Sequence, residues 1–263
     1  MRKYADLAII GTKEHTAYLN SVWANFLAKI VYLYMQFSLW NALFSSNAGR
    51  NIPLSHDETI RYIIAATLIS TFMECDVTMW INGQIQSGDV ANQLIRPIDY
   101  RIMIFAKHIG TSAVKLLIYT LPFGILTALF YHDDLFCKEQ LLYGILSIIL
   151  AYMIQFLYSL IIGLMAFWLI VTWPLNMLLA AVYKLLSGSW IPAAMFPKLL
   201  TTINMFLPFR AIYAIPVTII TTPMSPGSIR ENLCFQLIWL AVLFLLSEVT
   251  WITGKNKLIV QGG

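Results

Sequence analysis

The chain has 263 residues, of which 59% are hydrophobic and only 11% are charged, and its formal net charge is +4. Soluble globular domains carry about 25% charged residues, so this composition, with a mean hydropathy of +0.72, excludes an ordinary soluble domain. We predict an all-α integral membrane protein in which residues 1–263 form a single transmembrane domain, and the small net charge needs no nucleic-acid partner to explain it.

The first 21 residues are amphipathic rather than continuously apolar. One set of side chains can face lipid and another can face water: Tyr4, Leu7, Ala8 and Ile10 against Arg2, Lys3, Lys13 and Glu14. A helix with this division lies in the plane of the membrane interface. We therefore predict an interfacial helix at residues 1–21.

Six apolar segments follow, each suited to crossing the bilayer. A spanning helix needs about 20 residues, so the chain has room for about six spans and short loops. We expect spans at residues 22–44, 60–82 and 105–130, two more within 141–186, and a last one at 232–252. The turn inside the 141–186 run is placed near residues 163–168. Tryptophans near the expected span ends fit an interfacial aromatic belt: Trp23, Trp40, Trp80, Trp190 and Trp251.

The segment 187–231, ahead of the last span, is apolar but repeatedly interrupted. The interrupting residues are Gly188, Pro192, Pro197, Pro208, Pro216, Pro223, Pro226 and Gly227. A continuous spanning helix does not tolerate this density of proline. Short re-entrant or interfacial helices do, provided that they pack against protein, and we predict such helices here.

The distribution of lysine and arginine sets the expected orientation, because cytoplasmic loops carry the excess of these residues. With the N-terminus inside, the inner loops hold Arg2, Lys3, Lys13, Arg96, Arg101, Lys107, Lys255 and Lys257. The outer loops hold Arg50, Lys138, Lys198, Arg210 and Arg230. This bias favours both termini in the cytoplasm.

The polar stretch at residues 83–104 directly follows the second expected span. Gly88 and Asp89 have the pattern of a helix start, with the Asp89 carboxylate at the positive end of the helix dipole, and Pro97 would end the helix. Apolar residues alternate with polar ones throughout the stretch: Ile85, Val90, Leu94, Ile95 and Ile98. The pattern favours a short helix along the membrane surface at residues 84–96, and the alternative is an ordinary connecting loop.

Sequence motifs for catalysis and nucleotide binding are absent. The chain has no GxxxxGK[ST] motif for ATP and no HExxH, GxSxG or GxGxxG motif. Its four histidines are far apart, so we interpret them as solvated interfacial residues rather than metal ligands: His15, His56, His108 and His132. The three cysteines form no CxxC pair and indicate neither a disulfide framework nor a metal site.

Several motifs in order along the chain resemble the type-two ABC export permeases, in particular the daunorubicin-like branch with one six-helix permease per gene. The first part of the resemblance is Gly88-Asp89, then Leu94-Ile95-Arg96-Pro97, then Tyr100. The second is GLMAFWL at residues 163–169. The third is the series Ser187, Gly188, Ile191, Pro192, Phe196, Pro197, Leu207, Pro208, Phe209 and Pro216, and the tail Gly262-Gly263 also fits.

The resemblance implies a six-helix exporter half with an N-terminal elbow helix, a cytoplasmic coupling helix and extracellular re-entrant helices. It implies that the coupling region 84–100 meets the ATPase, with Gly88, Asp89, Leu94, Arg96, Pro97, Asp99 and Tyr100 as its residues. The family pairs two permease chains, identical or related, with two separately encoded ATPase subunits in the cytoplasmic membrane. ATP and Mg²⁺ would then be bound by the partner, and this chain would carry no cofactor.

The charged residues inside the expected spans include two lysines and three acids: Lys29, Glu74, Asp76, Lys115 and Glu248. A charge at mid-membrane costs about 2.5–3.5 kcal/mol or more, which favours pairing between the two lysines and the three acids. Our hypothesis is an inter-helix network above the coupling helix. The alternative is that the lysines extend to the interface and each acid is satisfied locally.

The favoured function is export of a hydrophobic or amphipathic substrate, with Met-rich and aromatic faces of spans two and five as a candidate path. A proton-coupled secondary transporter is the main alternative, because broken helices and buried acids are typical of that class. A membrane-embedded enzyme using Glu74 with Asp76 is a weaker one, since residues two apart on a helix point in different directions.

Overall fold

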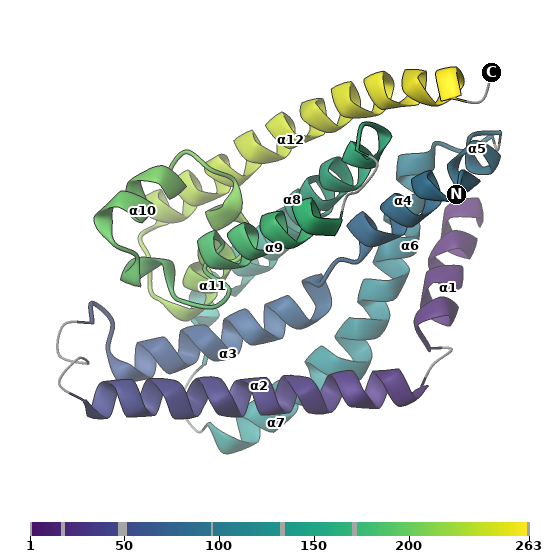
Figure 1. Cartoon of the computed structure of the whole chain (residues 1–263). Coiled ribbons are helices and arrows are strands. Elements are labelled where there is room, and N and C mark those ends of the chain that lie inside the picture. Colours follow the sequence, from purple (N-terminus) through teal and green to yellow (C-terminus); the bar gives the residue numbers. More distant parts are fainter. Residues whose placement is uncertain are drawn as a thin grey trace.

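The computed structural model describes residues 2–16, 19–46, 52–95, 97–131, 135–169 and 173–261. Within these ranges every regular element is a helix, in keeping with the all-α expectation. Figure 1 shows most of the long helices running roughly side by side between two ends of the molecule. The start of α1, the short helix α5 and the end of α12 lie at one end, and α10 lies at the other.

Helix α1 (Arg2–Thr16) packs along α6 (Tyr100–Lys115) and lies across the direction of α2 (Figure 1). The two backbones come unusually close at a pair of glycines. A Cβ atom at Gly110 would overlap the carbonyl oxygen of Ala8, and one at Gly11 would overlap that of Lys107. The expected interfacial helix at residues 1–21 is therefore shorter, ending at Thr16, and it is fixed by helix packing; its place in a membrane interface stays a prediction.

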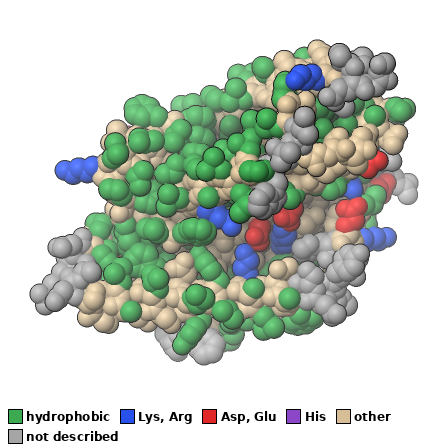
Figure 2. Space-filling view, viewed as in Figure 1, with side chains coloured by type: hydrophobic (Ala, Val, Ile, Leu, Met, Phe, Trp, Pro, Cys, Tyr) green, Lys and Arg blue, Asp and Glu red, His purple; other side chains and the backbone are tan. Residues whose placement is uncertain are grey.

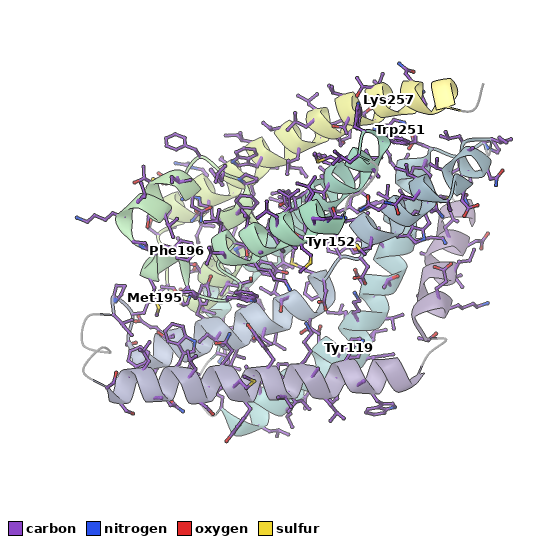
Figure 3. All side chains as sticks on the ribbon, in the orientation of Figure 1. Tyr119, Tyr152, Met195, Phe196, Trp251 and Lys257 are labelled. Carbon is purple, nitrogen blue, oxygen red and sulfur yellow. The ribbon has the colours of Figure 1, made fainter. Side chains whose placement is uncertain are left out.

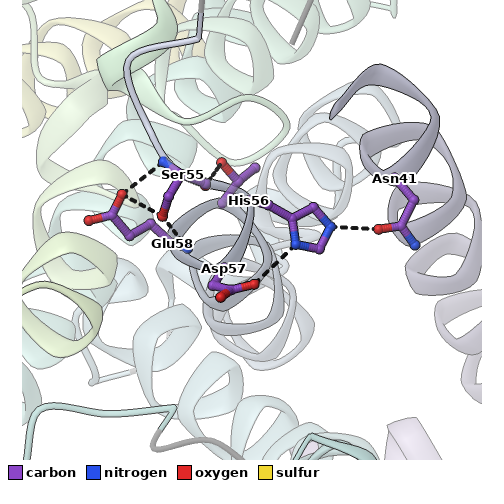
Figure 4. A network of polar contacts seen from close by, with 6 residues as sticks. Asn41, Ser55, His56, Asp57 and Glu58 are labelled. Atoms are coloured by element: carbon purple, nitrogen blue, oxygen red, sulfur yellow. Dashed lines mark hydrogen bonds and ion pairs between the residues drawn. The ribbon is translucent and has the colours of Figure 1, made fainter. Parts of the chain in front are cut away.

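Helices α2 (Leu19–Ser45) and α3 (His56–Met73) form the next antiparallel pair, close to the expected spans at 22–44 and 60–82. A capping box starts α3, in which the Ser55 hydroxyl accepts from the Glu58 N–H and the Glu58 carboxylate accepts from the Ser55 N–H. The His56 ring nitrogen Nε2 lies 2.6 Å from Asn41 Oδ1 on α2 (Figure 4). These contacts fix the α3 start against α2.

The second expected span is broken, which the sequence analysis did not predict. Helix α3 ends at Met73, residues 74–76 are not helical, and α4 (Val77–Gln86) continues from there. Glu74 and Asp76 therefore do not share a helix, so the argument that helical spacing turns them apart is wrong. A tight turn at Gly88, with φ at +78°, then leads into α5 (Asp89–Leu94). Glycine suits this left-handed conformation because it has no Cβ.

The third expected span, at 105–130, is longer than predicted and begins at Tyr100. It consists of α6, a π-helical turn (Leu116–Thr120) and α7 (Leu121–Phe130). The 141–186 run forms α8 (Leu141–Leu164), a 3-10 turn (Met165–Phe167) and α9 (Trp173–Leu186), so its bend lies close to the predicted position. With 14 residues, α9 is short for a spanning helix.

Short helices fill the segment ahead of α12, as the prolines predicted. They are a 3-10 turn (Ala193–Met195), α10 (Lys198–Asn204), a second 3-10 turn (Phe209–Ala211) and α11 (Ala214–Thr221). Pro192, Pro197 and Pro208 each directly precede one of these helices, where a missing N–H costs no hydrogen bond. Helix α12 (Pro226–Gln261) starts six residues earlier than the expected span, because Pro226 begins it rather than interrupting it.

Four helical stretches in the described part are long and apolar enough to cross a membrane: His56–Gln86, Tyr100–Leu129, Lys138–Phe167 and Pro226–Lys257. Pro174–Leu186 is apolar but shorter, and α2 is not among the four. The broader expectation of a multi-pass helical membrane protein is thus supported. The count of six spans remains a prediction.

Two expectations about single side chains are wrong. His108 is 5% exposed and stacks on Tyr152 with ring centroids 5.1 Å apart, so it is not a solvated interfacial histidine. Trp40 and Trp251 are also buried, so these two do not belong to an exposed aromatic belt. His56 is partly exposed, whereas the side chains of His15 and His132 lie outside the described part of the chain.

Candidate functional site

A cavity of 740 Å³ lies at the break between α3 and α4. Its walls come from α2, the break itself, α8 and α9. Figure 2 shows acidic and basic side chains gathered in a hollow of this face, which is otherwise largely hydrophobic. Charged side chains are rare within membrane-spanning segments, so a group of them there indicates a candidate functional site.

The break in the helix is filled by Lys115 from α6. Its ammonium donates a hydrogen bond of 2.8 Å to the backbone carbonyl of Glu74 and lies 3.4 Å from the carboxylate of Asp76. Only 7% of the Lys115 side chain is exposed. A cation at this position satisfies a carbonyl that the end of α3 leaves free and complements the negative end of the helix dipole.

A second ion pair lies on the α2 side of the break. Lys29 Nζ is 3.2 Å from the carboxylate of Glu74. The structure therefore brings together four of the five intramembrane charges that the sequence analysis grouped: Lys29, Glu74, Asp76 and Lys115. The two acids are more exposed than their partners, with 52% for Glu74 against 27% for Lys29, and 82% for Asp76 against 7% for Lys115.

Glu248 does not join this cluster. Its carboxylate lies 2.5 Å from the guanidinium of Arg101, which also pairs with Asp99 at 3.0 Å. Partial burial raises the pKa of the Asp99 carboxyl, but hydrogen bonds from the Arg101 side chain and backbone outweigh it and hold that pKa below its ordinary value. Glu248 thus connects α12 to the start of α6. Its ion pair is with Arg101, and it does not belong to the network that contains Glu74.

The remaining walls of the cavity were not identified from the sequence. Four tyrosines contribute to them, Tyr32, Tyr158, Tyr183 and Tyr213, and Met79 and Met177 line the path expected between spans two and five. Gln155 on α8 is only 6% exposed, and its side-chain oxygen has no hydrogen-bond partner. A glutamine in the middle of the apolar run 141–164 is a signal that sequence reasoning could have used.

The α4–α5 turn forms a second surface at the end of the molecule that also holds the start of α1 and the end of α12 (Figure 1). Helix α5 buries Val90 completely, whereas Asp89 and Pro97 are exposed. Ile95 is 82% exposed, more than any other large hydrophobic side chain in the described part. Leu94 is partly buried, and Arg96 lies outside the described residues. The surface helix is shorter than the expected 84–96, because residues 84–86 belong to α4.

An aromatic stack joins this surface to the rest of the molecule. The ring of Tyr100 lies between Trp80 of α4, at a centroid distance of 6.1 Å, and Trp251 of α12, at 5.3 Å, and both pairs are nearly parallel. Figure 3 shows Trp251 on α12 beside the end of α8. The Tyr100 hydroxyl donates to the Gln84 side chain at 3.2 Å. Tyr100 therefore holds α4, α6 and α12 together behind α5.

The proline-rich segment 187–231 packs at the C-terminal end of α9. Gly188 has a φ of +84°, and its carbonyl accepts a 2.8 Å hydrogen bond from the Tyr62 hydroxyl. Asn204 donates to the Leu186 carbonyl at 2.8 Å, and the Ala214 N–H donates to the Ser187 carbonyl at 2.9 Å. Pro216 lies in the first turn of α11, which is buried. Hydrogen bonds to backbone carbonyls, two of them from side chains, thus fix the segment against the helices.

No group of three or more His, Cys, Asp or Glu side chains in the described part is placed to hold a metal ion. Helices long and apolar enough to cross a bilayer define the class as a multi-pass membrane protein. The sequence model of one family, described as ABC-2 family transporter protein, matches residues 30–262. The chain therefore belongs to the ABC-2 transporter family, in which it is a membrane permease component. No curated protein matches it.

Proposed function

We propose that the chain is the transmembrane subunit of an ATP-driven exporter that moves a hydrophobic or amphipathic substrate out across the cytoplasmic membrane. Six spans would be formed by α2, α3 with α4, α6 with α7, α8, α9 and α12. Both termini and α5 would lie in the cytoplasm. ATP and Mg²⁺ would be bound by two copies of a separate ATPase subunit, and a second permease chain, identical or related, would complete the path.

The observation that carries this proposal is the family match together with the exposed α5 surface. An exposed isoleucine beside a short, rigidly supported helix is suited to insertion into a partner protein. The stack of Trp80, Tyr100 and Trp251 gives a physical route from that partner to α12. When the ATPase subunits close on ATP, they can shift the permease between conformations only if the closed ATPase dimer binds one conformation more tightly than the other. A rigid α5 would transmit this difference in binding to the rest of the chain.

The test is co-purification of an ATPase with the tagged chain from mild detergent. Replacing residues 84–100 by a Gly/Ser linker should abolish the association. Ile95→Ser should weaken it about tenfold or more, as expected for a central apolar anchor. Phe206→Ser, just beyond the end of α10, is the matched control, because Phe206 is 75% exposed at the opposite end and its substitution should leave the association unchanged.

A chain that purifies stably without any ATPase would contradict the proposal. Proton-coupled transport through Glu74 and Asp76 would then be the next hypothesis to test. In that case transport should depend on a pH gradient and be lost in Glu74→Gln or Asp76→Asn, because these carboxylates are the exposed acids of the cavity.

A further inference from the structure

We propose that the cavity at the helix break binds amphipathic cations, with the positively charged head group of the substrate at Glu74 and Asp76. This inference rests on the proposed transport function and names its substrate class. It follows from the exposure of the charged side chains, from an unpaired acceptor, and from the position of the lysines.

Exposure decides which charges a substrate meets first. The Lys115 ammonium is held behind the break by the Glu74 carbonyl, and Lys115 is not part of the cavity wall. The Asp76 carboxylate lines the cavity and is 82% exposed, at the long distance of 3.4 Å from Lys115. The acid therefore offers free acceptor positions to a ligand, whereas its basic partner offers no free face.

Gln155 provides an independent indication of a ligand that donates hydrogen bonds. It lines the same cavity, is 6% exposed, and its side-chain oxygen is unpaired. A buried acceptor without a partner costs about 1–3 kcal/mol, and an ammonium group in the cavity would remove that cost. The wall also includes the aromatic side chains of Tyr158 and Tyr213, a residue type whose rings attract cations.

Two lysines line the cavity and would favour an anion if they were free. Lys29 is paired with Glu74 at 3.2 Å. Lys184 lies with its ammonium 5.8 Å from the centre of the Trp190 ring. It is eight residues beyond Asn176 on α9, which corresponds to about 12 Å along the helix axis. Asn176 contacts Met79 just beyond the break, so Lys184 lies at the far end of the cavity from Asp76.

The experiment measures binding of two radiolabelled probes with the same chain and opposite charge, dodecylammonium and dodecanoate. The full-length protein is used in nanodiscs, in whatever complex it retains, and binding to empty nanodiscs is subtracted. We expect saturable dodecylammonium binding that weakens about tenfold in Asp76→Asn and in Glu74→Gln, since each removes a charged hydrogen-bond acceptor. Asp76→Glu keeps the charge and should retain binding.

Lys184→Met is the matched control within the same cavity and should leave dodecylammonium affinity unchanged. Tighter binding of dodecanoate that is lost in Lys184→Met would overturn the inference, as would cation binding that is equal in the wild type and both acid variants. Binding is measured without ATP. Failure of the substrate class is therefore distinguished from failure of the transport proposal, which shows as an absent ATPase.

Discussion

Lys115 contacts both ends of the helix break at 74–76. Its ammonium is the hydrogen-bond donor to the Glu74 carbonyl and the neighbour of the Asp76 carboxylate. A buried lysine is costly unless it is paired and hydrogen-bonded. At this position both conditions are met. The buried lysine therefore favours the one backbone arrangement in which it can contact both the Glu74 carbonyl and the Asp76 carboxylate.

Lys115→Met should therefore destabilise the protein by about 1.5–3 kcal/mol, the range for a hydrogen bond to a charged group. The physical reason is that the Glu74 carbonyl and the Asp76 carboxylate both lose their cationic neighbour. Thermal unfolding in detergent measures the effect. Lys198→Met on exposed α10 is the control and should stay within about 0.5 kcal/mol. Equal stability of the two variants would show that the break does not need Lys115.

Gly188 is a second position where one residue fixes the backbone. Its φ of +84° suits glycine, and an added Cβ would lie 2.7 Å from the Tyr62 hydroxyl. We expect Gly188→Ala to cost about 1–2 kcal/mol from the left-handed conformation alone. Gly83→Ala in α4 should instead stabilise by about 0.5–1 kcal/mol, because nothing lies within 4 Å of the added Cβ. Opposite shifts in unfolding temperature would check both predictions, and shifts of the same sign would contradict them.

At the scale of elements, α1 and α6 act as one unit because their backbones touch at Gly11 and Gly110. A Cβ atom at either position would meet a backbone carbonyl. Unlike a flexible side chain, this carbonyl cannot move aside without shifting the helix. The Lys107–Glu14 ion pair at 2.9 Å lies beside this contact. Exposed ion pairs contribute about 0–1 kcal/mol, so close packing rather than charge holds α1.

Gly110→Ala should therefore loosen α1 without unfolding the rest of the chain. The expected result is faster hydrogen exchange of the α1 amides, with exchange in α8 unchanged, because local opening needs only the α1 contacts to be lost. Gly124→Ala in α7 is the matched control, since its added Cβ would meet Leu68 at an ordinary 3.6 Å. Unchanged exchange of α1 in Gly110→Ala would mean that the two helices can separate at no cost.

The ring of Tyr100 connects three helices behind α5, so a change at this residue affects how these helices move together. Tyr100→Leu should reduce ATP-driven transport about tenfold or more while the ATPase still co-purifies, since the docking surface of α5 remains. Aromatic pairs contribute about 0.5–1.5 kcal/mol each beyond their buried area, and two pairs are lost. Tyr100→Phe keeps both and should transport normally in vesicles. Loss of the ATPase from Tyr100→Leu would instead make Tyr100 part of the docking surface.

Apolar runs predicted the helices well, as the expected 22–44 and the observed Leu19–Ser45 illustrate. The break at Glu74 was not predictable from periodicity, because no proline or glycine marks it and the stabilising donor comes from Lys115, 41 residues away. Lys29, Glu74 and Asp76 could be selected because charge is rare in spans, whereas Lys184, which also lines the cavity, was missed. The pairing of Glu248 with Arg101, and the tyrosine walls, depend on tertiary packing that composition does not encode.

At the scale of the whole molecule, the position of the ends sets how the parts work together. The start of α1, α5 and the end of α12 share one end, and the break between α3 and α4 lies between that end and α10 (Figure 1). The cavity at this break extends to Ser189, Trp190 and Tyr213 of the proline-rich segment. A movement of α5 would reach the cavity through α4, whose first residue directly follows Asp76. The α3–α4 break is thus the natural hinge between the two sites, as hinges are often element-terminal residues.

The orientation of the whole molecule gives the last prediction. Single cysteines are placed in a variant without Cys75, Cys137 and Cys234, one at Ser87 in the α4–α5 turn and one at Thr202 on α10. A membrane-impermeant maleimide should label Thr202→Cys in intact spheroplasts and Ser87→Cys only in inside-out vesicles. The reason is that the α5 end carries Arg101 and Lys107, and basic residues are retained on the cytoplasmic side. The reverse labelling would place α5 outside the cell, where no cytoplasmic ATPase could reach Ile95.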